Sequence, residues 1–436
     1  MASDHGFALT SYQRDIWVSE SIGYADPQFN VVFEEEIGPD VDTGILKACL
    51  ERVVRSNDAF SLRFDERDGV PFQWFHDGED SPAPVAVVDL SGASDPVAAA
   101  EAWRARALAR PFLLRRSPMF AIAILMTGLG PARLHLKAHH LIADAWALNQ
   151  VSLQLWAEYD RVQAAGSTPG SSTDGAGRPP SFDRLAEADV AYRGSAAYER
   201  DRAFHRARLE GVAPALFTRN TLRPADAEQS RVRRSFTVAA DLATRIRRQG
   251  SSPFAFLAAA LGTYLARVHR TDEVVLGIPF RNRTTGAEAV VGQCANSLPL
   301  RVAQRPGETL HHLARQVRAG ADALRGHERL ALGDILRDLP ADADGSRRLF
   351  DVTLSYLRHP VPSAGPMRPW PPRCTSRTRC PSWSTWRVTT GICTSTSTVP
   401  PTSSTTTSPS TPSPDTSSPC WRTASPTPNA RRRNCP

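Results

Sequence analysis

Leu134–Trp146, which reads LHLKAHHLIADAW, is the stretch that decides the fold. Apolar and polar residues alternate up to two adjacent histidines, His139 and His140, as they do in a half-buried strand. Asp144 follows, and an amphipathic helical pattern begins directly after it. Successive side chains of a strand point to opposite sides, so only one of the two histidines is expected to face a given cavity. An imidazole titrates near neutral pH, which makes the pair a candidate for proton chemistry.

Helical and extended patterns alternate on both sides of this stretch. Helices are expected over residues 9–20, 41–56, 96–110, 145–162, 195–209, 252–268, 308–325 and 332–339. Strands are expected over residues 29–33, 60–64, 72–75, 85–88, 119–126, 133–139, 273–278, 297–302 and 351–357. This alternation predicts the α/β or α+β fold class.

The length and local composition predict more than one folding unit. A chain of 436 residues exceeds a typical single core, so two domains are expected. Residues 165–181 are rich in Gly, Ser and Pro and have no apolar periodicity, which indicates a linker. The predicted organisation is therefore an N-terminal subdomain over 1–164, the linker over 165–181, a C-terminal subdomain over 182–360 and a tail over 361–436.

Charge and hydropathy argue against a nucleic-acid or membrane partner. The net charge of +7 comes from the tail, where nine Arg and one Asp give +8, so the rest of the chain sums to about −1. The sequence has no run of about 20 apolar residues that would predict a membrane span. Its N-terminus lacks the pattern of a secretory signal. A cytoplasmic location is therefore expected. The cysteine spacings match no zinc site, and neither a metal nor a disulfide framework is expected.

Several motifs occur together in an order that resembles one family. His139–Asp144 matches the HHxxxD signature of condensation domains of nonribosomal peptide synthetases. Six further segments resemble that family's motifs in sequence order: Leu9–Trp17, Arg55–Phe64, Tyr198–Phe204, Gly277–Arg283 (G-x-P-x-x-x-R), Val291–Arg301 and Leu349–Tyr356. The resemblance covers residue 8 to about residue 358.

The resemblance implies a fold and a reaction. The fold would be two chloramphenicol-acetyltransferase-like subdomains in a V, with an active-site tunnel between them. The reaction would join two carrier-bound thioesters through an amide bond, with phosphopantetheine arms entering from both sides. Upstream and downstream carrier proteins would be the partners, with an adenylation domain as a further candidate. No cofactor of its own is implied, and the chain would be free-standing or the N-terminal piece of a larger synthetase.

The family correspondence selects His140 as the catalytic histidine. It would act as a general base or as a hydrogen-bonding positioner of the attacking amine, and the sequence leaves both roles open. His139, the other member of the pair, is expected to be an ordinary strand-end histidine at least as readily as a catalytic one. Asp144 could be a base, a helix N-cap or a buried ion-pair partner. The resemblance favours an ion pair with Arg283 that fixes the loop.

Three neighbouring residues complete the candidate site. Ala145 stands where the family usually has Gly, and its methyl group would narrow a tight turn. Asn296 is a candidate to line the tunnel, and the alternative is a turn amide before a strand. Trp146 is expected to be a core residue rather than a functional one. The competing function is a non-catalytic, condensation-like interaction module, or an inactive fragment that has lost its reading frame.

Residues 361–436 have a composition unlike the rest of the chain, dominated by Pro, Ser, Thr, Arg, Trp and Cys. One interpretation is a disordered, low-complexity tail. The other is translation in the wrong frame. If each codon is taken as the last base of one triplet and the first two of the next, the TC-family serine codons become Phe, Leu, Ile or Val. Cys and Trp become Leu, Met or Val, and Thr becomes Tyr, His, Asn or Asp.

The shifted frame contains the patterns of regular secondary structure. Residues 393–398 then alternate between apolar and polar, as in a strand. Residues 380–386 also become mostly apolar, and residues 415–429 become an amphipathic helix. A true low-complexity tail has no reason to contain these patterns in another frame. We therefore predict that the reading frame is lost between about residues 360 and 374, which would leave the second subdomain incomplete.

Sequencing the gene across the codons for residues 358–375 tests this prediction. We expect an insertion or deletion that restores the shifted frame, because that frame continues the family resemblance. An intact frame, together with an expressed tail rich in Ser and Thr, would contradict it.

Overall fold

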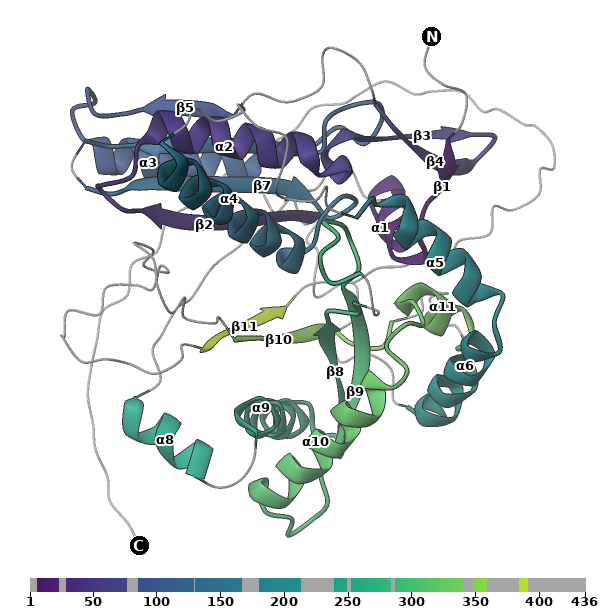
Figure 1. Cartoon of the computed structure of the whole chain (residues 1–436). Coiled ribbons are helices and arrows are strands. Elements are labelled where there is room, and N and C mark those ends of the chain that lie inside the picture. Colours follow the sequence, from purple (N-terminus) through teal and green to yellow (C-terminus); the bar gives the residue numbers. More distant parts are fainter. Residues whose placement is uncertain are drawn as a thin grey trace, which may run out of the picture. The chain divides into compact units, whose positions relative to one another are not determined.

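The structure is a computed structural model of the whole chain. It describes residues 6–22, 29–76, 85–128, 130–166, 180–212, 239–248, 252–283, 287–340, 348–358 and 384–390. Within these residues the fold is mixed α/β, as the alternating patterns predict (Figure 1). None of the described helices is long and apolar enough to cross a membrane.

The first half is built around a four-stranded sheet with the order β2-β7-β6-β5. Its strands are β2 (Asn30–Ile37), β5 (Ala86–Asp89), β6 (Phe120–Met126) and β7 (Ala132–His139). The helices of this half are α1 (Ser11–Ile22), α2 (Thr43–Ser56), α3 (Pro96–Ala109) and α4 (Ala145–Ala165). A smaller sheet, ordered β1-β4-β3, contains β1 (Phe7–Ala8), β4 (Val70–Phe75) and β3 (Leu62–Arg67). In Figure 1, α2 and α4 lie side by side against the larger sheet.

The second half has its own four-stranded sheet, ordered β11-β10-β8-β9. The strands are β8 (Glu273–Phe280), β9 (Asn296–Ala303), β10 (Val352–Arg358) and β11 (Ser384–Thr390). The helices are α5 (Asp183–Arg193), α6 (Ala196–Leu209), α8 (Ala240–Arg248), α9 (Pro253–His269), α10 (Leu310–Arg325) and α11 (Leu332–Arg337). Helices α9 and α10 pack against β8 and β9.

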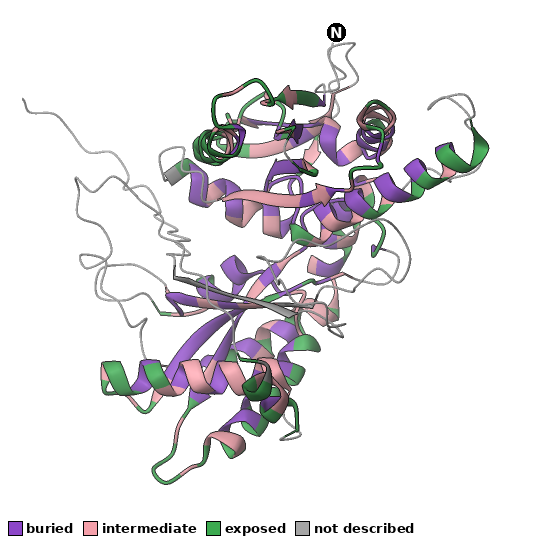
Figure 2. Cartoon of the chain, turned by 90° about the vertical axis from the view of Figure 1, so that its left-hand side faces the viewer, coloured by how far each residue is buried: buried purple, intermediate pink, exposed green. Residues whose placement is uncertain are grey.

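Buried side chains form two separate clusters, and one of them contains residues of both halves. Buried residues occur on the sheets and on the helices of both halves (Figure 2). The second cluster contains residues between Leu209 and Leu354. The first contains the apolar faces of α2, α4 and the β6–β7 hairpin. It also contains four residues from the segment between β8 and β9: Ala287, Val290, Val291 and Cys294. This segment therefore crosses from the second sheet into the core of the first half.

The structure differs from the sequence expectations in several places, including helices α5 and α8, which the sequence analysis did not predict. The first part of the predicted strand over 60–64 belongs to a 3₁₀ turn, η2 (Asp58–Ser61), which connects the end of α2 to β3. Of the expected linker, residues 167–179 lie outside the described residues, whereas Ala165 still belongs to α4. Of the expected disordered tail, residues 384–390 form strand β11, paired along its length with β10. The rest of the tail lies outside the described residues, and the subdomain boundaries stay predictions.

Asp15 of α1 joins the two halves where α1 meets α11. One of its carboxylate oxygens accepts a hydrogen bond of 2.8 Å from the backbone N–H of Gly333. A β-carbon at position 333 would lie 2.0 Å from the other oxygen, so this contact needs glycine. Burial raises the pKa of Asp15 from 3.8 to about 6, against the lowering effects of Gly333 and Arg337.

We expect Asp15→Asn to stabilise the chain more at pH 8 than at pH 5. An acid whose pKa is raised by folding contributes stability below its unfolded pKa, and that stability is lost as the pH rises through its folded pKa. With a folded pKa of about 6, the free energy of unfolding of the unaltered chain should fall by about 1.4 kcal/mol relative to that of the variant between pH 5 and pH 8. Urea unfolding of both proteins at both pH values measures the difference, and an equal difference at pH 5 and pH 8 would contradict it.

Candidate functional site

The two adjacent histidines lie where β7 ends beside β2. His139 is paired in register with Asn30 of β2, and the backbone N–H of His140 donates to the carbonyl of Phe29 at 2.8 Å. A turn comes next, because the N–H groups of Ile142 and Ala143 both donate to the carbonyl of His139. Helix α4 then begins at Ala145. The local sequence therefore places an imidazole on each side of a strand end.

His139 faces the interior and both of its ring nitrogens are bonded. Its Nδ1 accepts a hydrogen bond of 3.1 Å from the N–H of Leu141, so the proton of the neutral ring is on Nε2. That nitrogen lies 3.0 Å from a carboxylate oxygen of Glu20. The side chain is 2 % exposed and packs between the rings of Phe29 and Phe112. This geometry leaves His139 no free nitrogen for a substrate and gives it the contacts of a structural residue.

His140 points the other way and is half-buried. Its Nδ1 lies 3.2 Å from Oε1 of Gln293. The amide of Gln293 is oriented by its own NH₂ group, which donates to the carbonyl of Ala295 at 2.8 Å. An amide oxygen only accepts, so Nδ1 of His140 carries the proton and Nε2 keeps the lone pair. The tautomer is thus assigned from the hydrogen-bond network.

The protonation state of His140 is set mainly by burial. Burial lowers its pKa below the usual value of 6.5, and this outweighs the raising effects of Gln293 and of the nearby charge of Asp144. The ring is therefore neutral near neutral pH. A neutral imidazole with a free Nε2 lone pair is able to accept a hydrogen bond from an amine.

Asp144 accepts four hydrogen bonds from three different segments. One oxygen accepts from the N–H of Ala147 at 2.8 Å, which is the N-cap of α4, and from the guanidinium of Arg283 at 2.7 Å. The other oxygen accepts from the N–H groups of Cys294 and Ala295, each at 3.0 Å. Of the roles left open by the sequence, the structure thus contains both the helix cap and the ion pair in one carboxylate.

Arg283 binds the segment that carries Gln293. Besides Asp144, its guanidinium donates to the carbonyls of Val290 and Gly292, at 2.8 and 2.9 Å. The Arg283 and Asp144 side chains are only 5 % and 2 % exposed, so this pair is shielded from solvent. The pair therefore fixes the position of Gln293, and through it the orientation of His140.

The remaining predicted site residues have different positions. The Asn296 side chain donates to the carbonyls of Glu328 and Leu330 and accepts from the N–H of Leu332, so it fastens the loop before α11. Ala145 is exposed at the first position of α4. Trp146 is only partly buried, and the Arg281 guanidinium lies 4.5 Å from its ring centroid.

Two contacts of the histidine pair were absent from the sequence prediction. Gln293 is separated by 153 positions from His140, and no motif spacing relates the two. Glu20 ends the stretch predicted as the first helix, and nothing in that stretch indicates a partner for His139. Among the described residues, no group of three or more His, Cys, Asp or Glu side chains is placed to hold a metal ion.

Comparisons with known proteins find sequences and structures that are similar over most of the chain. A family model described as Condensation domain matches residues 4–361. The dimodular nonribosomal peptide synthase of Bacillus subtilis (strain 168) is 25% identical over 358 residues, which cover 81% of this chain and 15% of that protein. Phosphinothricin tripeptide synthetase PhsC of Streptomyces viridochromogenes is 28% identical over 325 residues, which cover 71% of this chain and 29% of that protein. The chain thus spans less than a third of either relative.

A solved structure is similar over most of the chain. It is a variant of the starter condensation domain of rhizomide synthetase RzmA, in complex with C8-CoA. The TM-score is 0.68 at 26% sequence identity, and the match covers 80% of this chain and 78% of that one.

We expect Asp144→Ala to lower the free energy of unfolding by about 3–5 kcal/mol, because it leaves the buried Arg283 guanidinium without its counter-charge. Replacing both partners, with Asp144→Ala and Arg283→Met, should cost less than the sum of the two single variants. Glu51→Ala, which removes a more exposed ion pair with Lys47, is the matched control and should cost at most about 1 kcal/mol. Urea unfolding measures all four, and strict additivity of the double variant would contradict the pairing.

Proposed function

Because the chain belongs to the condensation-domain family of nonribosomal peptide synthetases, we propose that it forms an amide bond between two carrier-bound thioesters. The observation that supports this proposal best is the orientation of His140. Its Nδ1 is bonded to Gln293, and Nε2 would be the nitrogen that receives the substrate amine. The substrates would be an acyl or peptidyl thioester as donor and an aminoacyl thioester as acceptor, each on the phosphopantetheine arm of a carrier protein.

The reaction needs a neutral amine held against a thioester carbonyl. The nitrogen lone pair of the acceptor attacks the donor carbonyl carbon, and a C–N bond forms. The C–S bond then breaks, and the sulfur leaves as a thiolate. The amine loses one proton and the thiolate gains one, so the products are an amide and the free thiol of the donor arm. No oxidant, metal or nucleotide is required by this balance.

His140 would contribute to this step by holding the amine. A pKa lowered by burial makes the ring a weak base but keeps it neutral, so Nε2 can accept a hydrogen bond from the amine without first losing a proton. This favours positioning, with His140 passing a proton on only after the C–N bond has formed. Fixing two tethered reactants in the attack geometry accounts for much of the rate of such reactions.

The other predicted residues would serve the site indirectly. Asp144 and Arg283 would hold the segment that presents Gln293, and His139 would anchor the strand end through Glu20. The tunnel, the V arrangement of the subdomains and the two carrier partners are part of this proposal. They rest on the family and on the likeness to solved condensation domains.

A second candidate function is a non-catalytic interaction module. The observation that favours it is the composition of residues 361–436, because a second half that lacks its last elements would leave the site without part of its surroundings. An amide-formation assay with both loaded carriers, run on the chain as written and on a frame-restored chain, separates the two functions. Activity of the restored chain alone would assign the loss to the tail.

We expect His140→Ala to keep the fold and to lower the rate of amide formation by about 10²-fold or more. The measurement is single-turnover amide formation between loaded carriers, with thermal unfolding as the check on folding. His312→Ala is the matched control, because His312 is 49 % exposed on α10 and lies outside the site.

The pH dependence separates His140 from the amine of the substrate. Protonation of His140 should reduce the rate only below its lowered pKa, that is below about 6.5. This fall should vanish in His140→Ala, whereas a fall caused by the acceptor amine should persist in it. A variant with the unaltered rate and pH profile would show that His140 does not act in the reaction.

A further inference from the structure

Helix α1 presents a stripe to the first core that is apolar in the middle and polar at both ends. Gln13, Ile16, Trp17 and Glu20 follow one another at intervals of three, one and three residues, which places them on one side of the helix. All four residues are buried, and Gln13 is 0% exposed. A buried Gln or Glu side chain is costly unless it is hydrogen-bonded, so both ends of the stripe need partners inside the protein.

The Gln13 amide uses every hydrogen bond that it is able to form. Its Oε1 accepts from the backbone N–H of Thr10 at 2.9 Å, and its own backbone N–H donates to Thr10 Oγ1, so the two residues form the capping box of α1. It also exchanges two hydrogen bonds with the Gln73 amide, at 2.8 and 2.9 Å. Its remaining N–H donates to the backbone carbonyl of Leu141 at 2.8 Å.

The capping box alone does not require glutamine at this position. A glutamate would complete the same box, but an ionised carboxylate is unable to donate a hydrogen bond. The donors of Gln13 go to Gln73 and to Leu141, the residue that follows His140. The amide at position 13 is therefore explained by contacts beyond its own helix.

Glu20 reaches the other backbone group of Leu141 through His139. Its carboxylate lies 3.0 Å from Nε2 of His139, and Nδ1 of the same ring accepts from the N–H of Leu141 at 3.1 Å. Gln13 and Glu20 are seven positions apart, which is two turns of the helix. One side of α1 thus holds both backbone groups of Leu141, one directly and one through an imidazole.

These contacts fix the backbone on each side of His140. Its N–H donates to the carbonyl of Phe29 at 2.8 Å. Because a peptide group is planar, the hydrogen bond to the N–H of Leu141 also fixes the carbonyl of His140. Gln13 holds the next peptide group through the carbonyl of Leu141. The direction in which the His140 side chain leaves the backbone is therefore set by these three hydrogen bonds.

We propose that Gln13 and Glu20 are positioning residues for the condensation reaction, because they fix the turn that directs the His140 ring. This inference rests on the proposed role of His140. It adds a restraint on the backbone to the restraint that Gln293 places on the ring itself. Neither Gln13 nor Glu20 would touch a substrate, so both would act only through His140.

Replacing Gln13 in two backgrounds tests this role. Gln13→Met removes the amide at a similar side-chain length, and we expect it to lower kcat at least about tenfold with KM for both carriers unchanged, because fewer rings are held in the attack geometry. In the His140→Ala background the same substitution should change the rate by less than about twofold. The measurement is amide formation between loaded carriers by the full 436-residue chain. An equal loss in both backgrounds would overturn the proposal.

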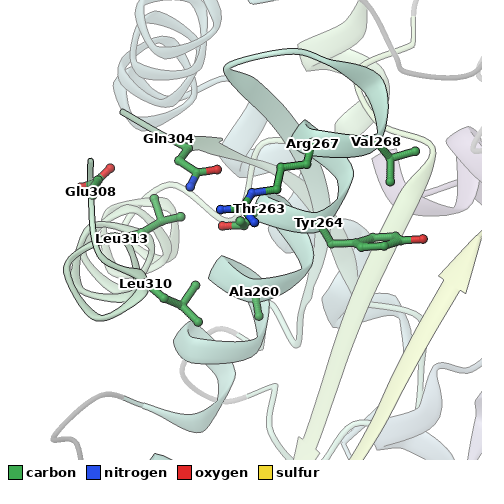
Figure 3. Close-up of a pocket in the computed structure, with 9 residues that line it drawn as sticks. All are labelled: Ala260, Thr263, Tyr264, Arg267, Val268, Gln304, Glu308, Leu310 and Leu313. Carbon is green, nitrogen blue, oxygen red and sulfur yellow. The ribbon is translucent and has the colours of Figure 1, made fainter. Parts of the chain in front are cut away.

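Two control variants separate positioning from stability. Asn57→Leu removes another buried amide, which donates to the carbonyl of Val53 at 2.8 Å and lies outside the site. It should lower the Tm and leave kcat unchanged. Gln304→Met repeats the glutamine-to-methionine change in a groove of about 590 Å³ between α9 and α10, and Figure 3 shows Gln304 among the residues that line it. This variant should leave both quantities unchanged.

The Glu20 contact is tested by a conservative and a non-conservative variant. Glu20→Gln keeps an oxygen that accepts from Nε2 of His139, so it should keep kcat within about twofold. Glu20→Leu removes the acceptor and should lower kcat at least about tenfold. Equal rates of the two variants would overturn the role of Glu20.

The ring protons of the two histidines give a readout that does not depend on activity. Histidine ¹⁵N shifts of the unaltered chain should place the proton of His139 on Nε2 and that of His140 on Nδ1. A proton on Nδ1 of His139 would overturn the proposal, because that nitrogen would be unable to accept from Leu141. This measurement and the Glu20 variants also decide the question if Gln13→Met fails to fold. Absence of amide formation by the unaltered chain would contradict the proposed function and leave the ring shifts as the test of positioning.

Discussion

The buried ion pair between Asp144 and Arg283 is the constraint on which the candidate site depends. One carboxylate caps α4, neutralises a guanidinium and binds two backbone N–H groups of the segment before β9. Each bond alone is an ordinary contact. Together they leave one position for the start of α4 relative to Gln293, because any shift would leave a buried charge or a buried N–H group unpaired. The geometry around His140 is thus held by a residue that has no part in the proposed reaction.

The same arrangement explains how two adjacent histidines acquire different properties. His139 has both ring nitrogens bonded, and its environment consists of a carboxylate and two aromatic rings. His140 is bonded through Nδ1 to Gln293, and its burial favours the neutral ring. The two histidines have different environments because consecutive side chains of a strand point to opposite sides of the sheet. Position within the sheet, rather than residue type, therefore distinguishes the structural histidine from the candidate catalytic one.

Local sequence patterns predicted most of the helices and strands. They did not predict the long-range contacts of the site. The strand over 133–139 and the helix after Asp144 are indicated by apolar periodicity and a cap, and the structure has both. Helices α5 and α8 were not predicted. Gln293 and Glu20 were missed for a different reason. Each contacts its histidine across more than a hundred residues, and no local spacing records such a pairing.

The crossing of the segment between β8 and β9 into the first core has a consequence for synthesis of the protein. Arg283 lies 139 residues beyond Asp144, and Cys294 lies 150 residues beyond it. At translation rates of about 5–20 residues per second, these partners are synthesised about 7–30 s after Asp144. During that interval α4 has no guanidinium to pair with its capping carboxylate, and four apolar positions of the first core are empty. The first half therefore cannot complete its core until part of the second half has been synthesised, even though every strand of its larger sheet has already been made.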